Sequence, residues 1–259
     1  MLVDSHCHLD HLKLDQFGGM LDRALDAANQ AGVEHFLCVG IDLDSWPEML
    51  HRVAHRSDVS CSVGLHPNGE LQSVPEAEDL ITRAQHRKVV AIGETGLDYH
   101  YGGGHRESQL ASFRVHAEAA RISCKPLIVH SRAAKVDTVQ VLREAAAQGV
   151  TGVMHCFTED WEMARQALDQ GFYISFSGIV TFRNAEDLRD VARRVPLDRM
   201  LVETDSPWLA PVPYRGKPNQ PAWVRSVAEH VAGLRGMTLE ALADVTTSNF
   251  YRLFGTGRV

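Results

Sequence analysis

Histidines and acidic residues recur in this 259-residue chain at spacings that suit a metal centre, beginning with His6 and His8. The further candidates are Glu94, His130, His155, Glu203 and Asp205. Imidazole and carboxylate ligands without thiolate suit Zn, Mn, Fe or Mg. Two such cations, about 3.5–4 Å apart, generate hydroxide at neutral pH and clamp a displacement at phosphorus or carbon. These residue types therefore predict hydrolytic chemistry at divalent metal ions.

Each candidate stands at or near the end of a short apolar run. Eight runs are interpreted as strands, at residues 2–6, 35–39, 59–64, 89–93, 126–130, 152–155, 172–176 and 200–204. Helix-like amphipathic segments lie between them, at residues 17–30, 46–56, 76–86, 107–121, 136–148, 161–170 and 185–193. The run Val89-Val90-Ala91-Ile92 is apolar at successive positions, which is typical of a parallel strand covered on both faces.

Repeated alternation of strand and helix predicts an α/β protein with a closed (β/α)8 barrel, and an open doubly wound sheet is the alternative. The length suits one barrel domain spanning residues 1–259. Two further helical patterns, at 223–234 and 239–254, follow a proline-rich loop at 206–221. We expect both to pack outside the barrel.

In such a barrel the carboxyl ends of the strands gather at one rim, so residues scattered in sequence converge there. Side chains alternate along a strand, and His6 and His8 therefore project to the same side. Asp205 ends the eighth strand, which closes beside the first, so it can join these histidines at one ion. The same carboxylate could move protons to the leaving group.

A second ion is predicted between the fifth and sixth strands, where His130 and His155 end neighbouring runs. Glu94 ends the fourth run and could bridge the two cations. Glu203 precedes Asp205 by two residues on the same strand face. It is expected either to orient a ligand or water, or to be a buried acid paired with a barrel neighbour.

Other polar and aromatic residues fall in the predicted rim loops. His66 could contact substrate oxyanions or be an ordinary loop histidine. A phosphate-binding rim could be formed by Arg132, Arg183, Arg215 and Lys217, which could equally be solvated charges. Aromatic side chains that could stack on bases or pack at the rim are Tyr99, Phe157, Trp208 and Tyr214.

The formal charge of −7 and a pI near 6.0 argue against a non-catalytic module that coats nucleic acid. The five cysteines are widely spaced without a C-x-x-C pair, which predicts free thiols in a reducing compartment. We see neither a signal-peptide pattern nor an apolar run long enough for a membrane. A cytoplasmic protein without a membrane or obligate protein partner is expected.

Several segments together resemble the TatD-type metal-dependent deoxyribonucleases. They are Asp4-Ser5-His6-Cys7-His8-Leu9-Asp10, Gly64-Leu65-His66-Pro67, Gly93-Glu94-Thr95-Gly96-Leu97-Asp98-Tyr99, His130-Ser131-Arg132, His155-Cys156-Phe157, Ser175-Phe176-Ser177-Gly178 and Glu203-Thr204-Asp205-Ser206-Pro207. The match extends from residue 1 to about residue 254, in order. The resemblance implies a TIM barrel of the amidohydrolase type that uses two divalent ions (Mg, Mn or Zn) to hydrolyse phosphodiesters, typically in DNA.

The resemblance also assigns roles to individual residues. The implied ligands of the first metal are His6, His8, Glu94 and Asp205. The implied ligands of the second metal are Glu94, His130 and His155. His66 and Arg132 are implied phosphate contacts, and Arg215-Gly216-Lys217 resembles a loop of the family. Asn68 departs from the family, which often has a second histidine there.

Two alternatives are kept open. A related barrel hydrolase could act on lactones, amides or other phosphoesters. Many such enzymes bridge their metals with a carbamylated lysine where this chain has Glu94, which favours the nuclease-like branch. The second alternative is a non-catalytic metal-binding scaffold, which would not need a complete ligand set.

Overall fold

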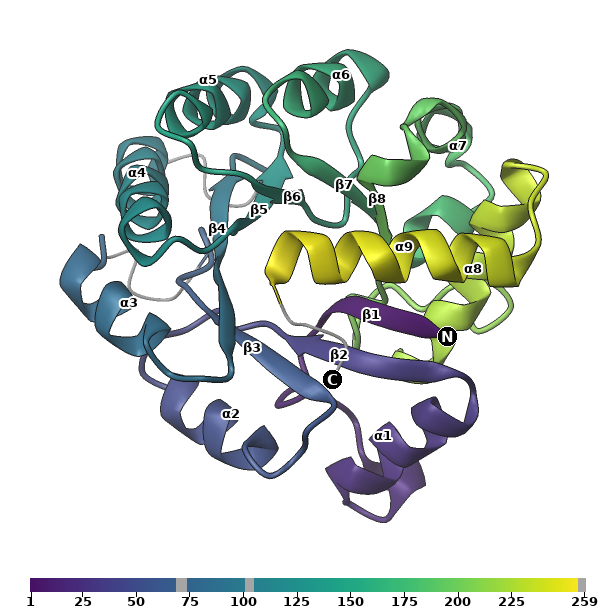
Figure 1. Ribbon diagram of the computed structural model, residues 1–259. Helices are drawn as coiled ribbons and strands as arrows, with labels where there is room; N and C mark the ends of the chain where they lie inside the picture. Colours follow the sequence, from purple (N-terminus) through teal and green to yellow (C-terminus); the bar gives the residue numbers. More distant parts are fainter. Residues whose placement is uncertain (69–73, 101–104, 256–259) are drawn as a thin grey trace.

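Eight parallel strands, paired in chain order from β1 to β8, form the centre of the computed structural model (Figure 1). The structure describes residues 1–68, 74–100 and 105–255. The strands are β1 Leu2–Cys7, β2 Val33–Cys38, β3 Val59–Val63, β4 Val89–Asp98, β5 Leu127–Arg132, β6 Gly152–Met154, β7 Tyr173–Phe176 and β8 Met200–Val202. Each overlaps a predicted strand, so the predicted barrel is confirmed.

The barrel closes between β1 and the segment that follows β8. Cys7 and Ser206 form an isolated parallel bridge, and the His8 N–H donates to the Ser206 carbonyl at 2.8 Å. Just below, the buried Asp4 carboxylate accepts hydrogen bonds from the N–H and hydroxyl of Thr204, at 2.8 and 2.6 Å. Side-chain bonds therefore join the first and last strands where ladder pairing is short.

Helices surround the barrel, as Figure 1 shows. Their bounds are α1 Leu21–Gln30, α2 Trp46–Val53, α3 Ala77–Ala84, α4 Arg106–Ser123, α5 Lys135–Ala146, α6 Trp161–Asp169, α7 Glu186–Arg194, α8 Val224–Leu234 and α9 Leu239–Phe254. Apolar side chains on one face of each helix pack against the strands, and polar side chains face solvent. The short 3-10 segments are η1 Asp15–Phe17, η3 Gly178–Thr181, η4 Leu197–Arg199 and η5 Pro221–Trp223.

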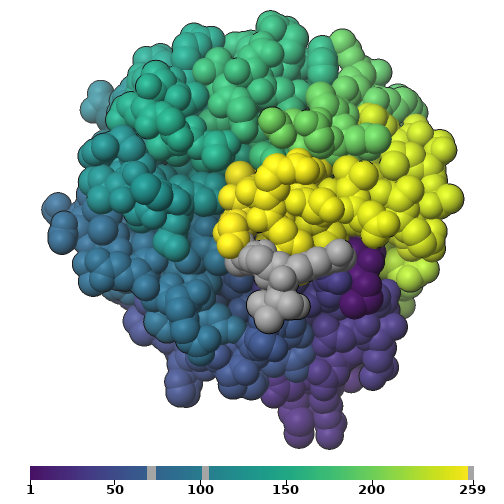
Figure 2. Space-filling model, viewed as in Figure 1, coloured from purple at the N-terminus to yellow at the C-terminus, as the bar shows by residue number. Residues whose placement is uncertain are grey.

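Helix α9 lies across the amino-terminal end of the barrel, where the atoms of its segment cross the middle of the face in Figure 2. Its side chains Phe250, Leu253 and Phe254 pack in one cluster with strand residues that include Val3 and Leu201. Both C-terminal helices were expected outside the barrel, and the position of α9 over the end differs from that of the surrounding helices. The large apolar side chains of α9 cover the apolar strand residues at that end of the barrel.

Strand β4 is longer than predicted and does not end before Glu94. The pairing of β4 with β5 shifts register between Ile92 and Thr95, after which β4 continues to Asp98. Gly93 has φ 137°, and a Cβ there would lie 2.6 Å from the Ile128 carbonyl oxygen. A side chain at residue 93 is therefore excluded, and Glu94 projects from an irregular point within the strand.

Two further expectations from the sequence concern membrane-spanning segments and the cysteines. Among the described residues, none of the helices has the length and apolarity needed to span a bilayer. All five cysteines are free thiols, as predicted.

Candidate metal centre

Four side chains meet at the carboxyl end of β1. The Nε2 atoms of His6 and His8 are 3.1 Å apart. Glu94 Oε2 lies 3.3 and 3.7 Å from these two nitrogens, and Asp205 Oδ1 lies 3.6 and 3.4 Å from them. His6, His8 and Glu94 are almost completely buried. The set predicted for the first metal is thus brought together with its ligand atoms facing one point.

The other carboxylate oxygen of Glu94 faces a second group. His155 Nε2 lies 2.7 Å from Glu94 Oε1, and His130 Nδ1 lies 3.3 Å from it. His66 Nε2 is also close, at 3.4 Å. Glu94 therefore stands between the two clusters, one oxygen toward each. His66, predicted as a substrate contact, lies as near to Glu94 as the predicted ligand His130.

Asp98 contacts His130 of the second cluster, and the sequence analysis did not predict it as a site residue. His130 Nε2 lies 3.2 Å from Asp98 Oδ2, which leaves Nδ1 directed at Glu94. The Asn68 amide donates to the same Asp98 oxygen at 2.8 Å. A carboxylate behind a histidine fixes its tautomer and orientation. An acid four residues after Glu94 in an extended segment was the available signal.

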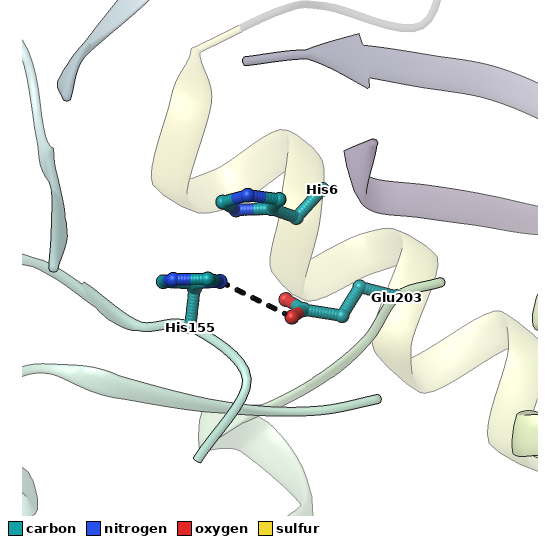
Figure 3. Close-up of side chains that lie close together, drawn as sticks. All are labelled: His6, His155 and Glu203. Atoms are coloured by element: carbon teal, nitrogen blue, oxygen red, sulfur yellow. Dashed lines mark hydrogen bonds and ion pairs between the residues drawn. The ribbon is translucent and has the colours of Figure 1, made fainter. Parts of the chain in front are cut away.

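Glu203 lies beneath both clusters, fully buried (Figure 3). Its Oε1 accepts a hydrogen bond from the Cys156 N–H at 2.8 Å and lies 3.4 Å from His155 Nδ1. The ring of His6 stacks on that of His155, with centroids 3.9 Å apart. Glu203 Oε2 and His6 Nδ1 are buried without a hydrogen-bond partner among the described residues. Glu203 is thus a buried acid paired with neighbours in the barrel, one of which, His155, is a predicted metal ligand.

Several residues at this rim that are not glycine adopt left-handed backbone conformations, among them Asp205 and Cys156. Asp205 has φ 56° and Cys156 has φ 42°. The Asp205 N–H donates to the His6 carbonyl at 2.9 Å, and the Cys156 N–H is bonded to Glu203. Such conformations cost roughly 1–3 kcal/mol and persist where surrounding bonds enforce them. These conformations place the Asp205 carboxylate at the first cluster and the Cys156 N–H against Glu203.

Burial and charge set the protonation of the cluster. Burial, and then the charge of His155, lower the pKa of His6, and burial lowers the pKa of His66 to about 4. Burial alone would raise the pKa of Glu94, but His155 and His66 hold that pKa well below its ordinary value. Burial alone would lower the pKa of His155, but Glu94 and Glu203 hold that pKa well above its ordinary value. A cation bound by this ring would therefore displace its proton.

The described residues fit divalent cations. Three sets of ligand atoms each lie within 4.8 Å of one another: His6, His8 and Asp205; His66, Glu94 and His130; His6, His155 and Glu203. His6 Nδ1 and Glu203 Oε2, both in the third set, are buried without a hydrogen-bond partner among the described residues. Buried polar atoms left unpaired within a set of possible ligands are an arrangement that a metal ion would satisfy.

A cavity of about 830 Å³ opens onto these clusters. His66 and Arg132, two predicted phosphate contacts, are among its lining residues. Arg215 and Lys217 are not among the described residues that line it. The Arg215 guanidinium lies over the ring of Phe182, 3.7 Å from its centroid, so that side chain packs at the rim outside the cavity.

Three of the four aromatic rim residues are engaged within the protein. The Tyr99 hydroxyl donates to Asp137 at 2.6 Å, and Phe157 is buried. Tyr214 stacks on Trp223 with ring centroids 4.1 Å apart. Trp208 differs, because it lines the cavity and is 46% exposed.

Comparison with known proteins gives concordant matches over nearly the whole chain. Residues 3–255 match the family model described as TatD related DNase. The "Uncharacterized metal-dependent hydrolase YcfH" of Escherichia coli K12 is 53% identical, covering 98% of this chain and 95% of that protein. The "3'-5' ssDNA/RNA exonuclease TatD" of Klebsiella pneumoniae is 30% identical, covering 95% of each. The crystal structure of YJJV, a TatD homolog from Escherichia coli K12, superimposes with a TM-score of 0.90 at 27% identity, covering 99% of this chain and 98% of that one.

Proposed function

This chain belongs to the family of TatD-related DNases and is a metal-dependent hydrolase, and from that premise we propose that it hydrolyses phosphodiester bonds in single-stranded DNA. The observation that carries the proposal is the position of Glu94, whose two oxygens face two separate histidine groups. The relative named as an exonuclease for single-stranded DNA and RNA supports this class of substrate.

We propose two divalent ions, Mg, Mn or Zn, one on each side of Glu94. The first would be held by His6, His8, Glu94 and Asp205, and the second by Glu94, His130 and His155. His66 approaches Glu94 closely enough to join the second set. Ions bound there supply charge neutralisation for the phosphoryl group and lower the pKa of an attacking water.

Four side chains have proposed roles toward the substrate itself. Asp205 is partly exposed to the cavity, in contrast to Glu94, so its carboxylate can take a proton from the attacking water and return it to the leaving oxygen. Arg132 lines the cavity and would hold a phosphate oxygen. We also keep the proposal that Arg215 and Lys217 contact a longer strand beyond the cavity.

The test is cleavage of single-stranded DNA by the purified protein with added Mg²⁺ or Mn²⁺. Asp205→Asn should reduce kcat by about 10²-fold or more, because it removes both a ligand charge and a proton acceptor. Asp244→Asn makes the same chemical change at an exposed position on α9 and should leave kcat unchanged.

A panel of lactones and small amides distinguishes the alternatives. Turnover of these compounds without DNA cleavage would overturn the nuclease proposal while keeping a metal-dependent hydrolase. Binding of less than about one ion per chain in excess Zn²⁺ or Mn²⁺ would instead favour the non-catalytic scaffold.

A further inference from the structure

The cavity above the metal centre has two chemically different walls. Segments at and after the ends of β3, β5 and β6 supply polar side chains: Asn68, Ser131, Arg132 and Thr158. Segments after β2, β7 and β8 supply apolar side chains: Ile41, Ile179, Trp208 and Leu209. Because the strands are paired in order around the barrel, these two sets occupy different halves of the rim. The histidine–carboxylate clusters lie between them.

Trp208 is the largest member of the apolar wall and is held in a fixed position. The backbone N–H of Trp208 donates to the Asp205 carbonyl at 3.0 Å, and the Trp208 carbonyl accepts from the Asn219 side-chain amide at 2.6 Å. The indole ring lies with its centroid 5.0 Å from that of His8, tilted by 66°. The backbone is therefore anchored beside a ligand of the first cluster while nearly half of the side chain faces the cavity and solvent.

Trp208 is exposed beside other apolar side chains of the cavity wall, so its indole extends a contiguous apolar surface next to the metal centre. A contiguous apolar surface in a cavity is typical of a ligand-binding site. Tyr99, Phe157 and Tyr214 satisfy their apolar surface within the protein, whereas Trp208 does not. Aromatic faces in nucleic-acid enzymes stack on bases, and this contact tolerates any base because every base has a π face.

We propose that Trp208, with Ile179 and Leu209, forms a subsite for the nucleobase of a nucleotide whose phosphate lies over the metal centre. This inference rests on the proposed function. A nucleotide carries a flat apolar base one sugar away from an anionic phosphate. The base would stack at the apolar wall while the phosphate meets Arg132 on the polar wall. The subsite would hold a base without selecting strongly among the four.

The test compares two single-stranded oligodeoxynucleotides of equal length, one normal and one with abasic residues throughout. Trp208→Ala should raise KM for the normal strand about tenfold or more and leave kcat within a fewfold, as expected for loss of one stacked base. Trp208→Phe should retain most of the affinity. Val212→Ala, an equally exposed apolar position in the same loop that does not line the cavity, serves as the control.

Binding without turnover gives an independent readout. With metal chelated, addition of the normal oligonucleotide should quench tryptophan fluorescence of the wild-type protein and Val212→Ala, and the quench should shrink in Trp208→Phe. Metal content and Tm of each variant show whether the His8 side of the site is intact.

The outcomes separate the two proposals. A KM that rises equally for normal and abasic strands, or does not change for either, would overturn the base subsite while the nuclease stands. If the wild-type protein cleaves neither strand under any metal condition, the proposed function fails first.

Discussion

At the scale of single residues, Glu203 is a buried carboxylate without a full set of hydrogen-bond partners among the described residues. One of its carboxylate oxygens holds the Cys156 N–H and approaches His155, and the other has no partner among the described residues. The unpartnered Nδ1 of His6 belongs to the same buried group. A carboxylate in this place can orient a ligand of each cluster, His155 directly and His6 through a water or on metal loading.

We therefore expect Glu203→Gln to lower the affinity for divalent ions by about 10–100-fold, since loss of an orienting carboxylate typically costs that much. Calorimetric titration of the metal-free protein with Zn²⁺ measures both ions. Asp98→Asn changes a contact of His130, which is proposed to hold the second ion, and should weaken that ion more than the first.

Glu240→Gln makes the same change on the exposed side of α9 and provides the matched control. Equal metal affinity in Glu203→Gln and the wild type would show that the charge of Glu203 does not contribute to metal binding.

The sequence predicted the clusters because strand alternation and strand ends follow directly from residue order. It placed His6, His8 and Asp205 on one rim, and the structure brings them together. Asp98 could not be placed in this way. Its approach to His130 depends on β4 continuing past Glu94 after a register shift, which is a property of backbone packing between β4 and β5.

At the scale of elements, α4 supports the site from outside the barrel through His116. This buried histidine donates from Nδ1 to the Ser112 carbonyl at 2.8 Å and accepts at Nε2 from the Leu65 N–H at 3.0 Å. The second bond holds the segment that carries His66. The bond from Leu65 requires a neutral ring with an unprotonated Nε2, and burial lowers the pKa of His116 to about 4.

This depressed pKa predicts a pH dependence of stability. The unfolded chain binds the proton below about pH 6.5, whereas the folded protein resists it until about pH 4, so the free energy of unfolding falls across that window as pH decreases. The contribution of His116 to this loss is on the order of 3 kcal/mol when complete. Urea unfolding of metal-free protein near neutral pH and at about pH 4.5 measures it.

His116→Gln keeps a polar side chain that cannot gain the charge. We expect its stability to fall less than that of the wild type over the same pH interval. An identical fall in both proteins would show that His116 contributes nothing to the pH dependence.

Helices and strands were predicted well where apolar periodicity is strong, and less well where tertiary contacts set their ends. The predicted fourth strand ended at Gly93, whereas β4 continues to Asp98. Glycine is required in this part of the barrel because neighbouring backbone atoms lie too close for a side chain. A Cβ on Gly64 would lie 2.6 Å from Gly93 Cα, and a Cβ on Gly93 would lie 2.6 Å from the Ile128 carbonyl oxygen, so β4 packs too closely on both neighbouring strands for side chains at these positions.

At the scale of the whole molecule, α9 completes the core at the end of the barrel opposite to the metal centre. Phe250 is fully buried there, and the Asn249 amide donates to the carbonyls of Leu197 and Met200 at 2.7 and 2.9 Å. Helical periodicity predicted the helix and its apolar face. It could not predict which surface the face covers, because the outer wall and the barrel end are both apolar.

Phe250→Ala should lower the free energy of unfolding by about 3–5 kcal/mol, because it opens a cavity among the strand residues beneath α9. Chemical denaturation measures the loss. Ser248→Ala, at an exposed position on the same helix, should change it by less than about 0.5 kcal/mol. A loss below about 1 kcal/mol in Phe250→Ala would show that α9 packs loosely on the barrel.

The position of α9 also restricts the path that a polymeric substrate can take. A strand that reaches the metal centre cannot be threaded through the barrel, because apolar side chains of the strands fill its interior and Phe250, Leu253 and Phe254 cover its far end. A nucleic acid would therefore have to approach and leave the centre from the rim onto which the cavity opens.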